Sequence, residues 1–419
     1  MDKDIACIIL AAGKSTRMKS DLPKVLHHIC GRPMLSYILD LVRVLKIKRT
    51  VVVLGYQQEE VKKIIPSGIT IVIQKKLLGT ADAVKQALFQ LKNFKGTVLV
   101  LYADNPLLEN STIKKLLTYH FKNKLDATLL TATLKNPSGY GRVLRDKYGS
   151  ICGIIEENDA DEFQKSIKEI NTGIICFNKE KLKEALAYVK LNKRKKEYYL
   201  TDVINIFYKK GYLIDSLKIT DINEALGINS RLDLAKANSL MQQRINYRLM
   251  ENGITIIDPR STFISYGARI GQDTVIYPFT VIENDVKIGR HCFIGPFVHL
   301  REGTVLGDEV VVGNFLEITR SKLSYKTLAK HFGYLGDAQI GRYVNIGAGT
   351  VTANFDGIKK YSTIIKDKAF IGSDTILIAP VKVGKNAYTG AGTVVVKHRN
   401  IPDKAVVVGI PARLLRIKR

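Results

Sequence analysis

The sequence predicts two domains: an α/β domain with a mostly parallel sheet, followed by a parallel β-helix. Two observations support this prediction. The first half of the chain alternates short apolar runs with amphipathic helical segments, which is typical of a parallel sheet with helices on both faces. The second half carries an aliphatic residue at every sixth position, which is the period of a β-helix. The length of 419 residues fits two or three domains of ordinary size.

The apolar runs of the first half predict the strands and helices of the α/β domain. The predicted strands are Ile5–Leu10, Thr50–Leu54, Ile69–Ile73, Thr97–Leu101, Ala127–Thr133 and Gly173–Phe177. The predicted helices are Pro33–Lys46, Thr80–Leu91 and Ser111–Asn123. Because ligands of such sheets bind beyond the carboxyl ends of the strands, residues that directly follow these runs are the first candidates for a site.

A single long helical pattern separates the two halves. It runs without interruption from Ser230 to Asn252 and predicts a rigid connecting helix. The predicted organisation is therefore an α/β domain over residues 1–229, a linker helix over 230–252 and a β-helix over 253–419.

The second half repeats with a period of six residues. Aliphatic side chains occupy ten successive sixth positions: Ile264, Ile270, Ile276, Ile282, Ile288, Ile294, Leu300, Leu306, Val312 and Ile318. In a β-helix such residues point inward and stack on their counterparts one coil away. The period lapses over 319–339 and 352–364, and both segments are predicted to be loops that leave the coil. Loops on a rigid scaffold are good places for function.

Composition narrows the classes of function. Lys and Arg number 65 against 39 Asp and Glu, which gives a net charge of +26. The charge is spread along the chain, which argues against a specific nucleic-acid partner and suits small polyanionic substrates. No apolar stretch is long enough for a membrane-spanning helix, so no membrane is expected as a partner. The five cysteines are scattered, so reduced thiols in the cytoplasm are expected.

The segment after the first predicted strand is a candidate phosphate site. Leu10-Ala11-Ala12-Gly13 consists of mostly small residues, which let backbone N–H groups approach a phosphate. Arg17 and Lys24 follow and supply positive charge for a polyphosphate. The alternative is an ordinary strand–turn–helix corner with two solvated cations.

Two further strands end in polar side chains. Asp104 follows the strand Thr97–Leu101, where a carboxylate can hold Mg²⁺ that bridges phosphates. The alternative role for Asp104 is to cap the next helix. Gln74 and the pair Gly79-Thr80 follow the strand Ile69–Ile73 on the same expected edge, and an amide there can pair with a nucleobase. A Gln in this place accepts thymine as well as uracil.

These residues resemble a known family. The segment from Leu10 to Met18, followed by Pro23-Lys24, resembles the signature of sugar-1-phosphate nucleotidyltransferases. Together with the hexapeptide half, nearly the whole chain is similar to the bifunctional N-acetylglucosamine-1-phosphate uridyltransferase/glucosamine-1-phosphate N-acetyltransferases. The resemblance implies a Rossmann-like nucleotidyltransferase domain, a left-handed β-helix and a homotrimer. It also implies Mg²⁺ as cofactor and UTP, sugar-1-phosphates and acetyl-CoA as substrates.

The resemblance also assigns residues to the uridyltransferase site. The nucleotide phosphates would lie against Leu10, Ala11, Ala12, Gly13, Arg17 and Lys24, the base and ribose against Gln74, Gly79 and Thr80, and the sugar against Tyr102, Gly141, Glu156 and Asn171. Mg²⁺ would lie between Asp104 and Asn229. Lys24 and Arg17 would be the catalytic cations, which neutralise charge on the reacting phosphates.

For acetyl transfer, the resemblance indicates His331 as the general base. The sugar phosphate would contact Arg301, Tyr334, Asn345, Asn354 and Lys360, and acetyl-CoA would contact Ala348, Ser373 and Ala391. Thr319 stands where the family has a phosphate-binding lysine, with Arg320 beside it, and Phe355 replaces a tyrosine. A lone histidine is more often a surface or packing residue. The alternative function is therefore a monofunctional nucleotidyltransferase whose β-helix only assembles the oligomer, and a non-catalytic scaffold is a second alternative.

Overall fold

The computed structural model describes residues 4–14 and 16–417. Contacts between Cα atoms group the chain into two compact units, Met1–Leu240 and Met241–Arg419. The division falls inside helix α8 (Arg231–Glu251). This helix confirms the predicted one, Ser230–Asn252, to within one residue at each end. The predicted domain limits at 229 and 253 stay a prediction.

All six strands predicted for the first unit are present in one mixed sheet. Its main strands, in spatial order, are β11 (Ile214–Lys218), β7 (Ala127–Thr133), β10 (Glu169–Asn178), β6 (Thr97–Tyr102), β1 (Ile5–Ala11), β4 (Arg49–Leu54) and β5 (Thr70–Ile73). Neighbouring pairs among β6, β1, β4 and β5 are parallel, and so is the β7–β11 pair. Strand β10 runs antiparallel to both β6 and β7. A hairpin of β8 (Gly141–Arg145) and β9 (Ile151–Ile155) extends from β10.

The helices of the first unit lie on both faces of this sheet. The three predicted helices correspond to α1 (Met34–Val44), α3 (Thr80–Leu88, continued by η3, Phe89–Leu91) and α4 (Asn110–Lys122). The remaining elements are η1 (Thr16–Met18), η2 (Lys24–Leu26), β2 (His28–Ile29), β3 (Arg32–Pro33), α2 (Gln58–Lys62), α5 (Glu162–Ser166), α6 (Lys179–Leu186), α7 (Asp202–Lys209) and η4 (Ile222–Ala225). Alternate residues of β1 enter different apolar cores, Ile8 on one side and Ile9 on the other, so the sheet is buried on both faces.

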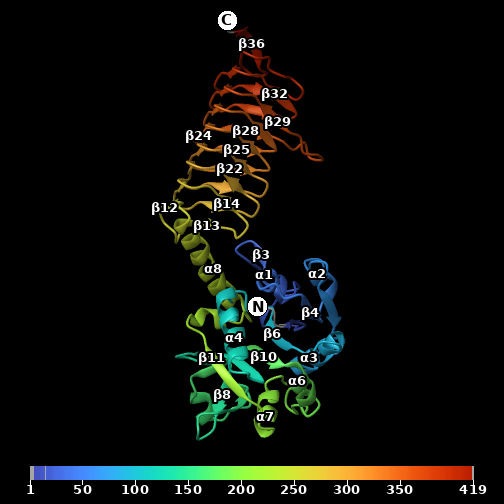
Figure 1. Ribbon diagram of the computed structural model, residues 1–419. Coiled ribbons are helices and arrows are strands. Elements are labelled where there is room, and N and C mark those ends of the chain that lie inside the picture. Colours follow the sequence, from blue (N-terminus) through green and yellow to red (C-terminus); the bar gives the residue numbers. More distant parts are fainter. Residues whose placement is uncertain (1–3, 15, 418–419) are drawn as a thin grey trace. The chain divides into compact units, whose positions relative to one another are not determined.

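The second unit is a left-handed β-helix built from three parallel sheets (Figure 1). The first holds β12 (Thr255–Ile256), β15 (Val275–Ile276), β18 (Phe293–Ile294), β21 (Val311–Val312), β24 (Leu328–Ala329), β27 (Asn345–Ile346), β30 (Phe370–Ile371), β33 (Tyr388–Thr389) and β35 (Ala405–Val408), with β36 (Arg413–Ile417) antiparallel at its end. The second holds β13 (Phe263–Ile264), β16 (Val281–Ile282), β19 (His299–Leu300), β22 (Leu316–Thr319), β25 (Gly333–Gly336), β28 (Thr350–Ala353), β31 (Ile376–Ile378) and β34 (Val394–Val395). The third holds β14 (Arg269–Ile270), β17 (Lys287–Ile288), β20 (Val305–Leu306), β23 (Lys322–Leu323), β26 (Ala338–Ile340), β29 (Thr363–Ile365) and β32 (Val381–Val383).

The prediction of an ejected loop at 319–339 is wrong. Strands β23, β24 and β25 continue the coil through this segment, and Leu323, Ala329 and Leu335 are buried inside it. The six-residue phase is lost because two corners are one residue shorter. The buried residues Ile318 and Leu323, and likewise Leu335 and Ile340, are five positions apart instead of six, and Arg320 and Asp337 stand at these two corners. His331 therefore lies on a corner of the coil and not on a loop outside it.

The second predicted loop is confirmed. It is shorter than the predicted 352–364, because β28 extends to Ala353 and β29 begins at Thr363. Residues 355–360 are all exposed, with an isolated bridge between Phe355 and Lys360 and backbone hydrogen bonds to the Asp356 carboxylate. The coil resumes at β29 (Figure 1).

None of the helices in residues 4–14 and 16–417 combines the length and the apolar character needed to cross a membrane.

Candidate active sites

In the first unit, strand pairing brings the phosphate segment beside the candidate metal ligand. Leu10 of β1 is the register partner of Tyr102 of β6, and the Ala103 N–H donates to the Leu10 carbonyl at 3.0 Å. The parallel pairing places both carboxyl ends at one edge of the sheet. Leu10, Ala11 and Ala12 are buried, and Gly13 is exposed at that edge. Residue 15 of this segment lies outside the described residues.

Three residues from distant parts of the chain meet at this edge. The Lys24 Nζ lies 2.5 Å from Asp104 Oδ2 and 3.1 Å from Asn229 Oδ1. A carboxylate oxygen and an amide oxygen therefore already face one cation. Mg²⁺ prefers such oxygen ligands and needs only one or two from protein, because phosphates and water supply the rest. The residues thus fit the metal that the family resemblance implies. The described residues contain no group of three or more acidic, His or Cys side chains suited to a metal.

The candidate base-binding residues lie around the start of α3. Gln74 is buried, and its Nε2 donates to the Gly79 carbonyl at 3.0 Å and to Asp82 Oδ2 at 2.7 Å. Because both N–H groups are engaged, the amide presents Oε1 as an acceptor, which matches the imide N–H of uracil or thymine. Gly79 has a φ of 97°, and a Cβ there would lie 2.6 Å from the Tyr198 carbonyl oxygen. The Thr80 hydroxyl accepts a hydrogen bond from the Leu200 N–H at 2.9 Å.

The candidate sugar-binding residues also converge. Gly141 of β8 is the register partner of Asn171 of β10. A Cβ on Gly141 would lie 3.6 Å from Glu156 Oε2, so the Glu156 carboxylate lies close by. Burial raises the pKa of Glu156, and the Thr201 hydroxyl donates to Oε1 at 2.9 Å.

Tyr102 completes this group at the end of β6. Burial is the main cause that raises the pKa of Tyr102, and the carboxylates of Glu156 and Asp104 add to it. A Cβ on Gly173, whose φ is 85°, would lie 2.8 Å from the Tyr102 ring. Gly173 lies inside β10, where a glycine often marks the close approach of another group, but the strand predicted from the sequence began at Gly173, so this signal was missed.

Arg17 is not brought into this cluster. It is exposed in η1, and no hydrogen bond or ion pair of its side chain occurs within the described residues.

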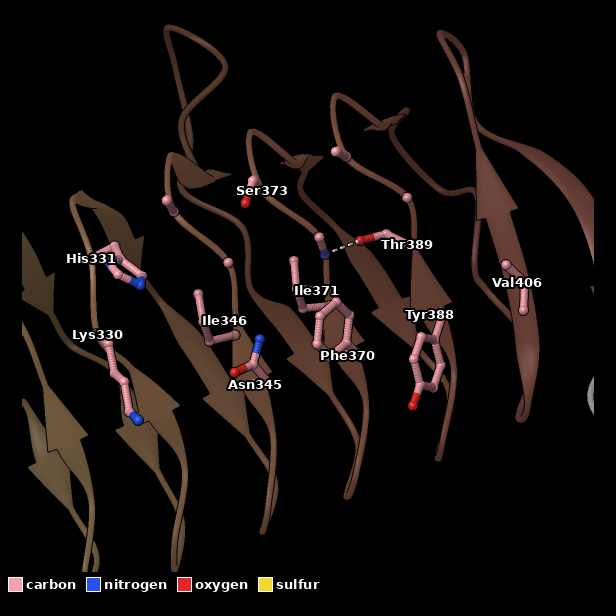
Figure 2. A pocket seen from close by; sticks show the side chains of 15 residues that line it. Lys330, His331, Asn345, Ile346, Phe370, Ile371, Ser373, Tyr388, Thr389 and Val406 are labelled. Carbon is pink, nitrogen blue, oxygen red and sulfur yellow. Dashed lines mark hydrogen bonds between the residues drawn. The ribbon is translucent and has the colours of Figure 1, made fainter.

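In the second unit, a cavity of about 490 Å³ lies along the successive coils of β24, β27, β30 and β33 and reaches Val406 of β35 (Figure 2). Five candidate residues line it: His331, Asn345, Ala348, Ser373 and Ala391. Ala348, Ser373 and Ala391 each follow a glycine at the same corner of the coil. A Cβ on Gly347 or Gly372 would lie 2.6 Å from the backbone of the next coil, so a larger residue does not fit at either position. Phe370 and Tyr388 stack at 5.2 Å between ring centroids and form an apolar wall. Figure 2 shows the His331 imidazole at one end of this row of residues.

Three candidates for sugar-phosphate binding, Arg301, Tyr334 and Asn354, lie on or directly after strands of the second sheet. Asn345 instead lies on β27 and lines the cavity, and Lys360 is exposed in the loop after β28. Arg301 pairs with Glu317 at 2.8 Å, and Glu317 is the register partner of Tyr334. A Cβ on Gly336 would lie 2.5 Å from the Tyr334 hydroxyl and 2.6 Å from Asn354 Nδ2, which places these two side chains together.

Arg320 belongs to the same cluster. Its guanidinium binds Asp337 through two hydrogen bonds of 2.7 and 2.8 Å, and Asn354 also donates to Asp337. The pKa of Asp337 is held below its usual value chiefly by Arg320, with smaller effects from Asn354 and Lys360. Sequence reasoning missed Asp337 and Glu317, because neither belongs to a recognisable local motif.

Comparison with known proteins agrees with this division. Residues 7–156 match the family model of MobA-like NTP transferase domains. Residues 267–301 and 285–320 match the bacterial transferase hexapeptide model, and residues 362–397 match the hexapeptide repeat of succinyl-transferase.

Relatives extend the similarity to nearly the whole chain. A bifunctional protein GlmU from Lactococcus lactis subsp. cremoris is 44% identical and covers 96% of this chain and 94% of its own. The proteins of the same name from Desulfitobacterium hafniense and Geobacillus thermodenitrificans are 42% and 41% identical, each over 96% of this chain and 95% and 94% of their own.

Proposed function

Because this chain belongs to the family of bifunctional GlmU proteins, we propose that the two sites described above catalyse its two reactions. The chain makes UDP-N-acetylglucosamine: it transfers acetyl from acetyl-CoA to glucosamine-1-phosphate, and uridyl from UTP to N-acetylglucosamine-1-phosphate. The observation that carries the assignment of sites is the cavity in the second unit. His331 borders it together with Ala348, Ser373 and Ala391, which are expected at acetyl-CoA, and with Asn345, which is expected at the sugar phosphate.

Uridyl transfer takes place at the edge of the sheet in the first unit. A phosphate oxygen of the sugar-1-phosphate attacks the α-phosphorus of UTP, a new P–O bond forms, and the bond to the β-phosphate breaks with release of pyrophosphate. This reaction needs position and charge neutralisation more than a protein base. Lys24 and Arg17 supply positive charge, while Tyr102, Gly141, Glu156 and Asn171 orient the sugar and Gln74, Gly79 and Thr80 orient the base.

Asp104 and Asn229 hold the divalent metal of this reaction. Bound Mg²⁺ supplies further neutralisation of phosphate charge. The support for this assignment is that both side-chain oxygens already face a single cation, the Lys24 ammonium.

Acetyl transfer takes place at the cavity in the second unit. His331 removes a proton from the ammonium of glucosamine-1-phosphate, and the free amine attacks the thioester carbonyl. A C–N bond forms, the C–S bond breaks, and coenzyme A leaves as its thiol. Arg301, Tyr334, Asn345, Asn354 and Lys360 bind the sugar phosphate, and Ala348, Ser373 and Ala391 lie against acetyl-CoA.

One assay separates this function from its alternative. Purified protein supplied with acetyl-CoA, glucosamine-1-phosphate and UTP should yield UDP-N-acetylglucosamine, identified by mass spectrometry. A monofunctional nucleotidyltransferase would yield this product only when N-acetylglucosamine-1-phosphate is supplied in place of the amine.

We expect the chain to form a homotrimer through the β-helix. Phe279, Phe297 and Phe315 stack along one corner with centroids 4.9 Å apart, although each is about half exposed. Such an apolar ladder on a surface is suited to burial between subunits. Light scattering should give three times the mass of the chain, and Phe297→Glu should lower that mass. A wild-type protein with the mass of one chain would contradict the expectation.

Gly79→Ala should weaken UTP binding. The φ of 97° and the close approach of the Tyr198 carbonyl mean that a methyl group must shift the backbone beside Gln74 and Thr80. Such strain costs about 1–3 kcal/mol, so the KM for UTP should rise roughly fivefold or more. Gly68→Ala is the matched control, because Gly68 also has positive φ but open space around it. An unchanged KM for UTP in Gly79→Ala would contradict the assigned base site.

The reactions are expected in the cytoplasm. All five cysteines are free thiols, as is usual for proteins in a reducing compartment.

A further inference from the structure

The Lys24 ammonium occupies the point on which the two proposed metal ligands converge. It lies 2.5 Å from Asp104 Oδ2 and 3.1 Å from Asn229 Oδ1, and its side chain is 11% exposed. Among the described residues, the Lys24 ammonium has no other hydrogen-bond partner. Both hydrogen bonds of the Lys24 ammonium are therefore donated to the two oxygens that the proposed metal site requires.

The backbone that carries the two oxygens is held in place without Lys24. The Ile228 N–H donates to the Asp104 carbonyl at 3.0 Å, which ties the segment before Asn229 to the segment after β6. The Asn229 N–H in turn donates to Asp233 Oδ2 at 3.0 Å, at the start of α8. Removal of the lysine side chain would therefore leave both oxygen-bearing side chains on a tethered backbone at the same edge of the sheet.

A dication and this ammonium exclude each other. Mg²⁺ binds oxygen at about 2.0–2.1 Å, so a metal bound to both oxygens would lie within van der Waals contact of Nζ. Repulsion between charges of +2 and +1 at such a distance is large, even with strong screening. The lysine has a flexible four-carbon stem, so its ammonium can move while the oxygens stay.

We propose that the Lys24 ammonium occupies the metal position in the nucleotide-free protein. It thereby weakens the binding of a divalent ion that arrives without nucleotide. When metal and nucleotide arrive together, the ammonium leaves Asp104 for the phosphates, and the metal takes its place between Asp104 and Asn229. The metal thus binds well only with the nucleotide. This inference rests on the proposed uridyltransferase site.

The test is metal binding in the absence of nucleotide. Mn²⁺ is titrated into the protein, and the free ion is followed by electron paramagnetic resonance, with Mg²⁺ competition to confirm the site. Lys24→Met keeps the length of the side chain up to Cε and removes the ammonium, and Lys24→Gln is a second variant in case the first does not fold. Either variant should bind Mn²⁺ at least about tenfold more tightly than the wild type, a gain of about 1.4 kcal/mol.

Two controls make the result specific. Lys14→Met removes an exposed lysine from the same loop and should leave Mn²⁺ affinity at the wild-type value. Adding Asp104→Asn to Lys24→Met should abolish the gain. Equal or weaker binding in both folded Lys24 variants would overturn the inference, as would a gain that survives Asp104→Asn. The proposed function fails separately, if the wild-type protein forms no UDP-N-acetylglucosamine.

Discussion

His331→Ala is expected to abolish acetyl transfer while uridyl transfer from N-acetylglucosamine-1-phosphate stays near the wild-type rate. His331 borders the cavity along the β24, β27, β30 and β33 coils, which belongs to the second unit alone. The substrate amine is protonated at neutral pH and cannot attack a thioester until a base removes a proton. Loss of a positioned general base lowers rates by about 10²–10⁴-fold.

The measurement is kcat/KM for each reaction, followed by release of the coenzyme A thiol and of pyrophosphate. His291→Ala is the matched control, because His291 is also exposed at a corner of the coil but lies outside this cavity. The control should leave both reactions unchanged. An equal loss of both reactions in His331→Ala would contradict the assignment of two separate sites.

Asp104→Ala is expected to have the converse effect: uridyl transfer falls while acetyl transfer stays near the wild-type rate. The Asp104 carboxylate is the only acidic side chain that binds Lys24 within the described residues, and its partner oxygen comes from Asn229. Without it, the metal loses its charged ligand and Lys24 loses its anchor. Loss of an electrostatic group of this kind costs about 10²–10³-fold in kcat, whereas acetyl transfer should remain.

Pyrophosphate release at saturating substrate checks this expectation. Glu162→Ala is the control, because it also removes one carboxylate, and the Glu162 side chain is 92% exposed in α5. Uridyl transfer within a few-fold of the wild type in Asp104→Ala would show that the metal is held elsewhere.

Local pattern was enough to predict most of the fold. The six strands and three helices of the first unit were predicted because each buries one apolar face or run, which leaves a periodic trace in the sequence. The strands β8, β9 and β11 were not predicted. β11 in particular is only half-buried and contains Asp215 and Ser216, so its apolar pattern is weak.

The β-helix shows where a strict six-residue count does not predict the structure. Ten matches at sixth positions predicted the β-helix, but the segment 319–339 was wrongly taken to leave it. A corner shortened by one residue shifts the phase of every later residue, although the inward side chains still stack. A period alone cannot distinguish such a shift from a loop, since only the strand pairing decides it.

For the sites, the sequence by itself determined the chemistry available: a small-residue segment after the first strand, Asp104 after another, and a histidine among hexapeptide repeats. Only the tertiary structure decided which of these groups meet. Lys24, Asp104 and Asn229 are separated by up to 205 positions, yet their side chains share one ion-binding point. Arg320 and Asp337 are 17 positions apart and pair because one coil of the helix lies on the next. The reason is physical. The type of each residue is a local property of the sequence, but the partners of its side chain depend on which strands pair and in which register. Burial of the whole core decides that pairing.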